Sequence, residues 1–330
     1  MTSRKGCVMA FRIPHRSAIG VAVRRTALLV TTVLALAGPA LAGCGSAGSG
    51  AGRGSGDAAL SVVASTDVWG SVVETVAGDT VEVITLVDDP SADPHSYEST
   101  PADTAAVTDA DLVVVNGGGY DEFMAEILGT LDAKRTVNAF ELAEGGGDDA
   151  HAHEGADEHV WYELPAVEAV AAQVAEELGS LLPERADTFT ANAAAFREDI
   201  DAIAAQLSAI GQANPGARVA LTEPIASYLV EDAGLTDVTP AEFLEAVEEE
   251  TDPPAAAVAA TRQLLSGNQV SALIYNPQTE TPVTQQVRSD AEAAGVPVVE
   301  MTETLPAGTE YVSWMTEQVE ALSSALDGRA

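Results

Sequence analysis

The chain has 330 residues, of which 51 are acidic and 15 are basic, and its formal net charge is −36. Such a polyanion repels the phosphate backbones of DNA and RNA, which excludes a nucleic-acid-binding protein, whereas divalent cations are drawn toward its surface. Residues 1–53 contain seven basic side chains and no acidic one. The acidity therefore belongs to the rest of the chain, and the two parts have different tasks.

Residues 1–43 are predicted to be a lipoprotein signal peptide. An Arg-Arg pair precedes TALLVTTVLALAGPALA, residues 26–42, an apolar run of the length of a signal h-region that a Gly-Pro pair weakens as a membrane span. The following LAGC is similar to the lipobox of bacterial lipoproteins, so we expect Cys44 to be lipid-modified and to become the first mature residue. A plain signal peptide with an incidental cysteine is the alternative, and Met9 is an alternative start to Met1.

Removal of this segment leaves Cys44 as the only cysteine. No intramolecular disulfide can then form, and the fold must be stabilised by its hydrophobic core. Residues 44–57 continue as GSAGSGAGRGSGD after the cysteine, with nothing to bury, and are predicted to be a flexible tether. We therefore expect an exported protein that a lipid anchors to the outer face of the cytoplasmic membrane.

The remaining chain alternates short β-branched runs with longer helical stretches, which is typical of parallel βαβ units. In a first lobe, residues 58–184, strands are predicted at 60–66, 81–87, 111–117 and 135–140. In a second lobe, residues 213–330, they are predicted at 217–223, 235–239, 269–277 and 296–303. The expected fold class is α/β, with two lobes that each contain a parallel β-sheet flanked by helices.

A long helix is predicted between the lobes. The alanine-rich helical pattern is interrupted at Pro183, but no glycine or proline occurs from Arg185 to Ile210. This gives a helix on the order of 40 Å long at about 1.5 Å per residue. We assign residues 185–212 to a rigid interlobe helix and expect limited rocking of the lobes rather than wide closure.

Four side chains of metal-binding type lie where ligands bind in parallel α/β sheets, beyond the carboxyl ends of the strands or in the loop before the long helices. They are His95, His159, Glu223 and Glu303, two from each half of the chain. If a cleft between the lobes brings them together, two imidazoles and two carboxylates neutralise a divalent cation and suit zinc or manganese better than copper.

Each of these residues has a simpler interpretation. His95, within DDPSADPHSYEST, is also placed to cap or hydrogen-bond its own loop, and His159 is also consistent with a solvated acidic loop. Glu223, before Pro224, is also suited to favour the start of a helix, since carboxylates stabilise helix N-termini. Spacing alone leaves both interpretations open, because ligands far apart in sequence leave no compact signature.

The motifs DPHSYE, EHVWYE, TEPIASYL and TETLP occur in this order. With them, the chain from about residue 60 to its C-terminus resembles the zinc- and manganese-binding solute-binding lipoproteins of bacterial ABC transporters. The resemblance implies a receptor with two lobes and a rigid connecting helix that carries one metal ion to a membrane permease and its ATPase. We expect it to be a monomer and not an enzyme.

The resemblance also implies a ligand set. It matches His95 and His159 to the two histidine ligands of the family, in their Asp-Pro-His and His-x-Trp settings. Glu223 falls where zinc-type members have a third histidine and manganese-type members a glutamate. Glu303 falls where the manganese-type members have an aspartate, with Glu300 and Thr302 as neighbouring alternatives.

The choice between zinc and manganese stays open. The loop before His159 is short, HAHEGADEH, where many zinc-type members have a long histidine-rich tract. His151 and His153 either capture metal transiently or belong to a disordered acidic loop. Glu223 and the short loop favour manganese, whereas the HVW motif favours zinc.

Two other classes of protein are consistent with parts of this pattern. A lipid-anchored metallohydrolase needs an open metal position and a general base, yet the chain has no HExxH motif and no nucleophile elbow. A receptor for an organic anion needs basic or aromatic contacts, and only 5% of the residues are aromatic. The cation receptor is therefore preferred to both.

Three further runs have ordinary interpretations. NGGGYDEF, residues 116–123, is predicted to be a turn near the cleft, and FLEAVEEETDPP, residues 243–254, a solvated acidic face. Asn276 and Gln278 follow a predicted strand, either as part of a turn or as donors that orient a metal ligand.

Overall fold

A computed structural model describes residues 60–143 and 157–328, all of which lie in one compact unit. Several predictions concern residues outside this part of the chain: the signal peptide at 1–43, the tether at 44–57 with Cys44, and His151 and His153. Within the described ranges, no helix combines the length and the apolar character that crossing a membrane requires.

The first sheet has four parallel strands in the order β2-β1-β3-β4. Their bounds are Leu60–Thr66 for β1, Val81–Val87 for β2, Leu112–Val115 for β3 and Thr136–Asn138 for β4. Val62 pairs with Val83 on one side and with Leu112 on the other. β1 and β3 are rich in buried valine because helices cover both faces of a parallel sheet.

The helices of this half follow the strands in chain order. They are α1, Asp67–Ala77; α2, Pro101–Asp109; α3, Glu122–Gly129; and α4, Ala139–Ala143. Thr100 starts α2 with a capping box that includes Asp103, and a proline at its first position suits a helix start. Two short 3₁₀ turns, Pro94–Ser96 and Val160–Tyr162, lie at His95 and directly after His159.

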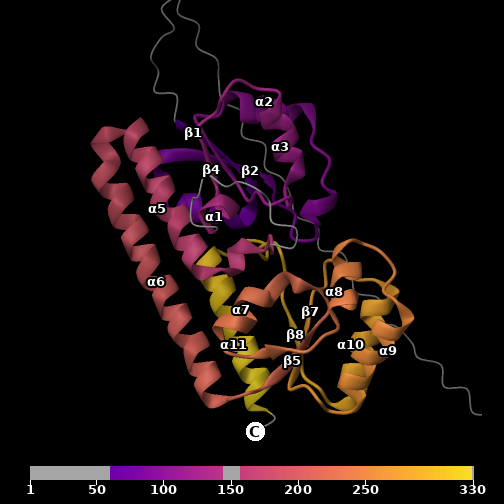
Figure 1. The fold of residues 1–330 in the computed structure, drawn as a ribbon. Coiled ribbons are helices and arrows are strands. Elements are labelled where there is room, and N and C mark those ends of the chain that lie inside the picture. Colours follow the sequence, from indigo (N-terminus) through magenta and orange to yellow (C-terminus); the bar gives the residue numbers. More distant parts are fainter. Residues whose placement is uncertain (1–59, 144–156, 329–330) are drawn as a thin grey trace, which may run out of the picture. The chain divides into compact units, whose positions relative to one another are not determined.

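Two long helices, α5 (Leu164–Leu181) and α6 (Ala186–Ala213), run side by side and are joined by a short turn at Pro183–Arg185 (Figure 1). The buried residues of α6 recur every three, four or seven positions, as an amphipathic helix requires. They are Phe189, Phe196, Ile200, Ile203, Leu207 and Ile210. The predicted long helix is confirmed as α6, whereas the domain boundaries stay a prediction.

The second sheet repeats the arrangement of the first, with the order β6-β5-β7-β8 and all pairs parallel. Its strands are β5, Arg218–Leu221; β6, Thr236–Asp237; β7, Ala272–Tyr275; and β8, Val298–Glu300. Its helices are α7, Ser227–Asp232; α8, Ala241–Glu248; α9, Ala255–Ser266; α10, Pro282–Ala294; and α11, Tyr311–Asp327. The predicted two-lobed α/β fold is confirmed.

The two halves share one hydrophobic cluster, which extends from β1 and α1 through α5 and α6 to β5 and α11. α6 contacts α1 and α5 of the first half as well as α7 and α11 of the second. A joint core of this kind resists large relative movement, because packed interiors are close-packed and not fluid.

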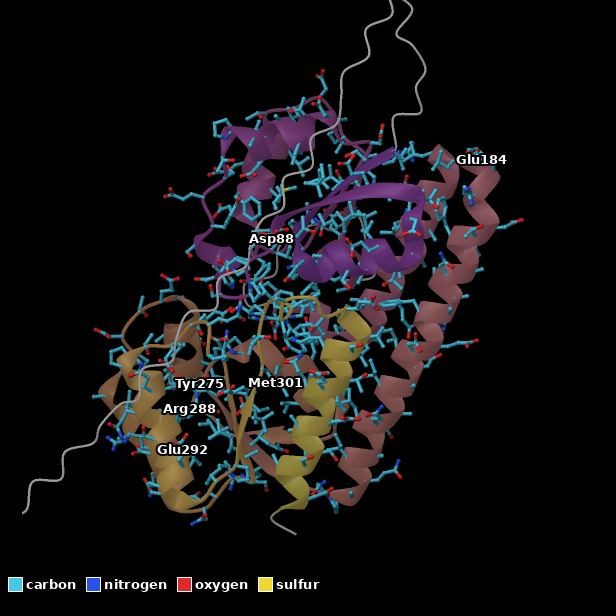
Figure 2. All side chains as sticks on the ribbon, turned by 180° about the vertical axis from the view of Figure 1, so that it is seen from behind. Asp88, Glu184, Tyr275, Arg288, Glu292 and Met301 are labelled. Atoms are coloured by element: carbon cyan, nitrogen blue, oxygen red, sulfur yellow. The ribbon has the colours of Figure 1, made fainter. Side chains whose placement is uncertain are left out.

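The edge of the second sheet is fastened to α10 through Arg288. Its guanidinium lies 2.9 Å from Glu300 at the end of β8 and 3.2 Å from Glu292 on the same helix, and it sits 5.0 Å from the centre of the Tyr275 ring (Figure 2). Arg288 is therefore engaged in local pairing, which includes Glu300, the alternative to Glu303 as a candidate ligand.

Candidate metal centre

His95 lies in the 3₁₀ turn that follows β2. Asp93 starts this turn by accepting a hydrogen bond from the His95 amide at 2.9 Å, and the fixed φ of Pro94 suits the turn. The His95 side chain is 27% exposed. Its ring packs edge-on against Tyr120, with the ring centres 4.7 Å apart, and its Nδ1 lies 3.3 Å from Glu158 Oε1. This contact leaves Nε2 directed to other partners.

The pKa of His95 is lowered from 6.5 to about 4, first by burial and then by the positive charge of His159. The His95 imidazole is therefore neutral near pH 7. A neutral imidazole is the form that binds metal ions.

His159 is almost completely buried and is held by the residue two positions earlier. Asp157 Oδ1 lies 2.7 Å from His159 Nδ1 and accepts the His159 amide at 3.0 Å. A hydrogen bond at Nδ1 fixes the ring orientation and leaves Nε2 as the ligand atom. Burial by itself lowers the pKa of His159, but the hydrogen bond and charge of Asp157, with Glu248 and Glu303, outweigh it and raise this pKa to about 10.

Glu303 is buried between the two halves of the molecule. Its Oε1 accepts from Asn276 Nδ2 at 2.8 Å, and its Oε2 accepts from Tyr120 Oη at 3.2 Å and lies 3.8 Å from His95 Nε2. Burial, and then the negative charge of Glu223, raise the pKa of Glu303 to about 8. Glu300, the neighbouring alternative, instead points to Arg288 with a half-exposed side chain.

Glu223 follows β5 and is also buried. Its Oε2 accepts a hydrogen bond from Thr279, but its Oε1 has no hydrogen-bond partner among the described residues. Burial raises the pKa of Glu223, although Thr279 and Asn276 act in the opposite direction. A buried carboxylate oxygen without a partner is costly. A cation at this place would satisfy it.

Of the four predicted residues, His95 approaches both Glu303 and His159 closely, whereas Glu223 is related to the others only through the effect of its charge. His95 and Glu303 are in direct contact, the ring centres of His95 and His159 are 6.2 Å apart, and the charge of Glu223 acts on both His159 and Glu303. Two ligands of one cation, each about 2.1 Å from it, are themselves about 3.0 to 3.4 Å apart. The separation of 3.8 Å between His95 Nε2 and Glu303 Oε2 exceeds that spacing by a few tenths of an ångström.

The sequence interpretation missed several residues of this cluster. Glu248 was expected on a solvated acidic face, but its Oε1 lies 3.6 Å from His159 Nε2 and its side chain is only 25% exposed. The expectation was wrong for Glu248 because the end of α8 reaches the cluster, whereas the other acidic residues of 243–254 are exposed, as expected. Asp157 and Glu158 were not singled out either, although each lies beside one of the histidines, and the acidic pair in DEHVW was the available signal.

Three other expectations are resolved by the same contacts. The turn at NGGGYDEF has positive φ at Gly117, Gly118 and Gly119 and places Tyr120 on Glu303, as expected of a turn near the cluster. Asn276 donates to the Glu303 carboxylate, and Gln278 Oε1 accepts the Glu303 amide at 2.6 Å. Both therefore position Glu303.

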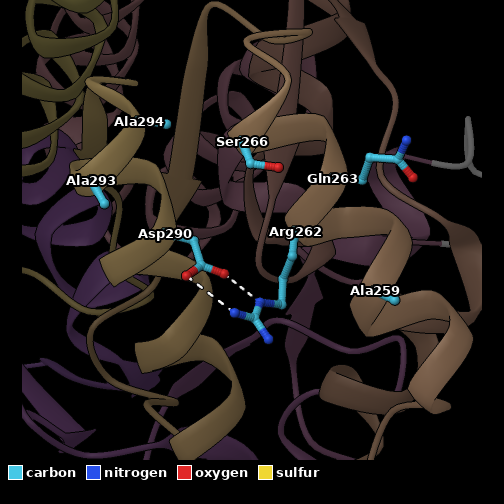
Figure 3. A pocket seen from close by; sticks show the side chains of 7 residues that line it. All are labelled: Ala259, Arg262, Gln263, Ser266, Asp290, Ala293 and Ala294. Carbon is cyan, nitrogen blue, oxygen red and sulfur yellow. Dashed lines mark hydrogen bonds and ion pairs between the residues drawn. The ribbon is translucent and has the colours of Figure 1, made fainter.

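A separate surface cavity of about 550 Å³ lies between α9 and α10 (Figure 3). It is lined by three alanines and by an ion pair between Arg262 and Asp290, together with Gln263 and Ser266. It contains none of the candidate metal ligands. We therefore do not assign the metal site to this cavity, although it is large.

A family model described as "Zinc-uptake complex component A periplasmic" matches residues 62–325. Among curated relatives, the zinc-binding lipoprotein AdcA of Streptococcus pneumoniae serotype 4 is 28% identical over 272 residues, which are 76% of this chain and 53% of that protein. The manganese-binding lipoprotein MntA of Bacillus subtilis is 30% identical over 163 residues, 49% of this chain and 52% of that protein. The chain thus spans about half the length of these relatives.

Solved structures share the fold. The periplasmic zinc-binding protein TroA from Treponema pallidum is 21% identical with a TM-score of 0.66, covering 81% of this chain and 99% of that one. FpvC from Pseudomonas aeruginosa, solved with Mn²⁺, is 21% identical with a TM-score of 0.66, covering 82% and 99%. Because the family model spans most of the described residues of both lobes, the chain belongs to the family of periplasmic zinc-uptake complex component A proteins.

Proposed function

We propose that this protein is the extracytoplasmic solute-binding component of an ABC transporter, which captures one zinc or manganese ion between its lobes and delivers it to a membrane permease. The observation that carries the proposal is the contact of His95 with Glu303, from opposite halves of the chain. It is supported by the buried Glu223 Oε1, for which the described part of the chain offers no hydrogen-bond partner. His159 completes the expected ligand set.

The chemistry of the donors suits such a cargo. His95 and His159 supply imidazole nitrogens whose other ring nitrogens lie against Glu158 and Asp157, so both rings are oriented before a cation arrives. Glu223 and Glu303 supply the negative charge that neutralises a divalent ion. Nitrogen and oxygen donors together suit zinc and manganese, and affinity alone does not select between them.

Binding without turnover is the role that this arrangement favours. Both histidines are occupied as ligands, so neither is left to act as a general base on a metal-bound water. We propose that the cation draws the four side chains together and thereby fixes the lobes in the form that the permease recognises. The shared core and α6 limit the movement to a small rocking.

The cellular setting is part of the same proposal. Residues 1–43 direct export, Cys44 carries the lipid that holds the protein at the outer face of the cytoplasmic membrane, and residues 44–57 tether the folded part. The relatives AdcA and MntA are named lipoproteins, which supports the assignment. We expect a monomer that works with a permease and its ATPase.

The test is elemental analysis of the purified protein after dialysis against zinc, manganese or both. We expect each chain to bind one transition-metal ion, and we expect zinc and manganese to compete for the same site. His95→Ala should abolish high-affinity binding and leave the circular dichroism spectrum unchanged, whereas Arg262→Ala, at the remote cavity, should bind normally. Absence of stoichiometric metal in the wild type, or full binding by His95→Ala, would contradict the proposal.

A further inference from the structure

We propose that Glu248, the last residue of α8, is an additional ligand of the captured cation and tunes its selection toward manganese. This inference rests on the proposed function, because it concerns the same cation. It goes beyond the four expected ligands, none of which comes from α8.

The first support is distance. Glu248 Oε1 lies 3.6 Å from His159 Nε2, and candidate ligand atoms of His95, His159 and Glu248 all lie within 4.8 Å of one another. Asp157 holds the Nδ1 of His159, so Nε2 is the nitrogen that faces Glu248. Two ligands of one cation are about 3.0 to 3.4 Å apart. A contraction of a few tenths of an ångström is therefore enough to place both on one ion, within the usual flexibility of side chains.

The second support is the rigid end of α8. Phe243, Ala246 and Val247 are buried and seat the helix against its lobe. Beyond Glu248 the chain reverses through Glu250, at φ 52°, with the Glu250 amide bonded to the Val247 carbonyl and the Thr251 amide to that of Ala246. This Schellman-type ending fixes the direction of the last helical turn. Glu248 is thus held at the cluster by the backbone, while the next two glutamates are exposed.

The third support is electrostatic. A helix C-terminus carries a partial negative charge, so a half-buried carboxylate there is unfavourable unless a positive charge lies nearby. Glu248 also lies within range of the negative charges of Glu223 and Glu158. In the metal-free protein the positive charge of His159 opposes this repulsion, and a divalent cation bound at His159 Nε2 takes over that role.

A third carboxylate changes the preference of the site. Two imidazoles with two carboxylates provide the four donors of a tetrahedral zinc site. A further oxygen raises the coordination number and the share of hard donors, which suits manganese better. Loss of Glu248 should therefore weaken manganese binding more than zinc binding.

The experiment compares Glu248→Gln with the matched control Glu249→Gln, which removes the same charge one residue farther along at an exposed position. Affinities for Mn²⁺ and Zn²⁺ are measured on the full-length protein by competition with chelators. X-ray absorption of the Mn²⁺-loaded protein counts the oxygen neighbours. We expect Glu248→Gln to weaken Mn²⁺ binding about tenfold or more, to affect Zn²⁺ less, and to lose one oxygen neighbour. The control should match the wild type.

The outcomes separate this inference from the proposed function. If the wild type binds metal and Glu248→Gln matches it in affinity and oxygen count, Glu248 is not a ligand and the function stands. If Glu249→Gln weakens binding as much as Glu248→Gln, the effect is one of overall charge and the inference fails. If the wild type binds neither metal, the proposed function fails and this inference fails with it.

Discussion

At the scale of single residues, the two candidate histidines are oriented by adjacent carboxylates. The Asp157 carboxylate is hydrogen-bonded to the Nδ1 of His159, and the Glu158 carboxylate lies near the Nδ1 of His95. The Asp157 carbonyl also accepts a hydrogen bond from Tyr228 at 2.9 Å, and the Glu158 carbonyl accepts one from Asn116 at 2.8 Å. This short segment is therefore held by side chains from both halves of the chain while it sets both imidazole rings.

Asp157→Asn should weaken metal binding without unfolding the protein. The amide oxygen still accepts from the ring, but the charge that strengthens the hydrogen bond and the ligand basicity of His159 is lost. Changes at such supporting partners typically cost about 10- to 100-fold in metal affinity. Chelator competition checks this, with Asp132→Asn, an exposed aspartate, as the control. Equal affinities in the two variants would mean that Asp157 does not support the site.

Sequence motifs predicted His95 and His159 as ligands but did not indicate the carboxylates beside them. Each histidine lies in a short motif, whereas Glu248 joins them only through the fold, and its neighbours in FLEAVEEE look alike in the sequence. Hydrophobic periodicity does not report which of several adjacent glutamates faces inward, since the end of a helix is set by tertiary packing. Glu223 and Glu303 were placed by resemblance and by the rule that ligands gather at strand ends.

At the scale of elements, the first two strands of the chain were predicted most accurately, although β2 lies at the edge of its sheet and is mostly half-buried. β1 and β2 match the predicted runs 60–66 and 81–87. β3 ends at Val115, before the predicted 117, because the Asn116 amide is taken by the Asp121 side chain at 2.7 Å and the chain turns. A hydrogen bond to a side chain five residues later defines this end, so the β-branched pattern does not reveal it.

A single side chain connects elements of the two halves beside the cluster. The amide of Gln278, after β7, donates to the Pro90 carbonyl at 3.0 Å and to Thr304 Oγ1 at 2.6 Å, and its oxygen accepts from the Glu303 amide. Pro90 belongs to the loop that leads from β2 to His95. Gln278 thus links the loop of one candidate ligand to the backbone of another.

Gln278→Met should lower both stability and metal affinity. Methionine fills a similar volume but leaves the Glu303 amide and the Thr304 hydroxyl without this partner, which costs about 1–3 kcal/mol for a buried polar group. Urea unfolding of the metal-free protein measures the first effect, and the rate of metal release to a chelator measures the second. Gln286→Met, on the exposed face of α10, is the control. Unchanged release by Gln278→Met would show that the link does not hold the site.

At the scale of the whole molecule, the folded state retains protons that the unfolded chain releases. Burial first, and then the neighbouring carboxylates, raise the pKa of Glu303 to about 8, and burial raises the pKa values of Glu248 and Asp67 to about 7. The pKa of His159 is raised to about 10 despite its burial. In each case the folded state binds more protons than the unfolded state. Stability therefore falls as pH rises from the group's pKa in the unfolded state to its pKa in the folded state.

His95 acts in the opposite direction over a different interval. Its lowered pKa of about 4 makes stability rise with pH up to about 6.5, where the unfolded histidine has lost its proton. Below pH 6.5 this rise partly offsets the loss of stability that the buried carboxyl groups cause as pH increases. Above pH 6.5 the contribution of His95 no longer changes with pH. The contributions of His159 and Glu303 then make the free energy of unfolding fall as pH rises.

We therefore expect the free energy of unfolding of the metal-free protein to fall between about pH 6.5 and pH 8. Urea unfolding in the presence of a chelator at several pH values measures this fall, and Glu303→Gln should reduce its slope, because one of the retained protons is then missing. Metal binding must displace the same protons, so the stabilisation that zinc or manganese provides should increase over the same interval. Calorimetry in buffers of different ionisation enthalpy should accordingly detect proton release on binding near pH 7. A metal-free stability that rises with pH in this interval, or binding without proton release, would show that the buried groups have already lost their protons before the cation arrives.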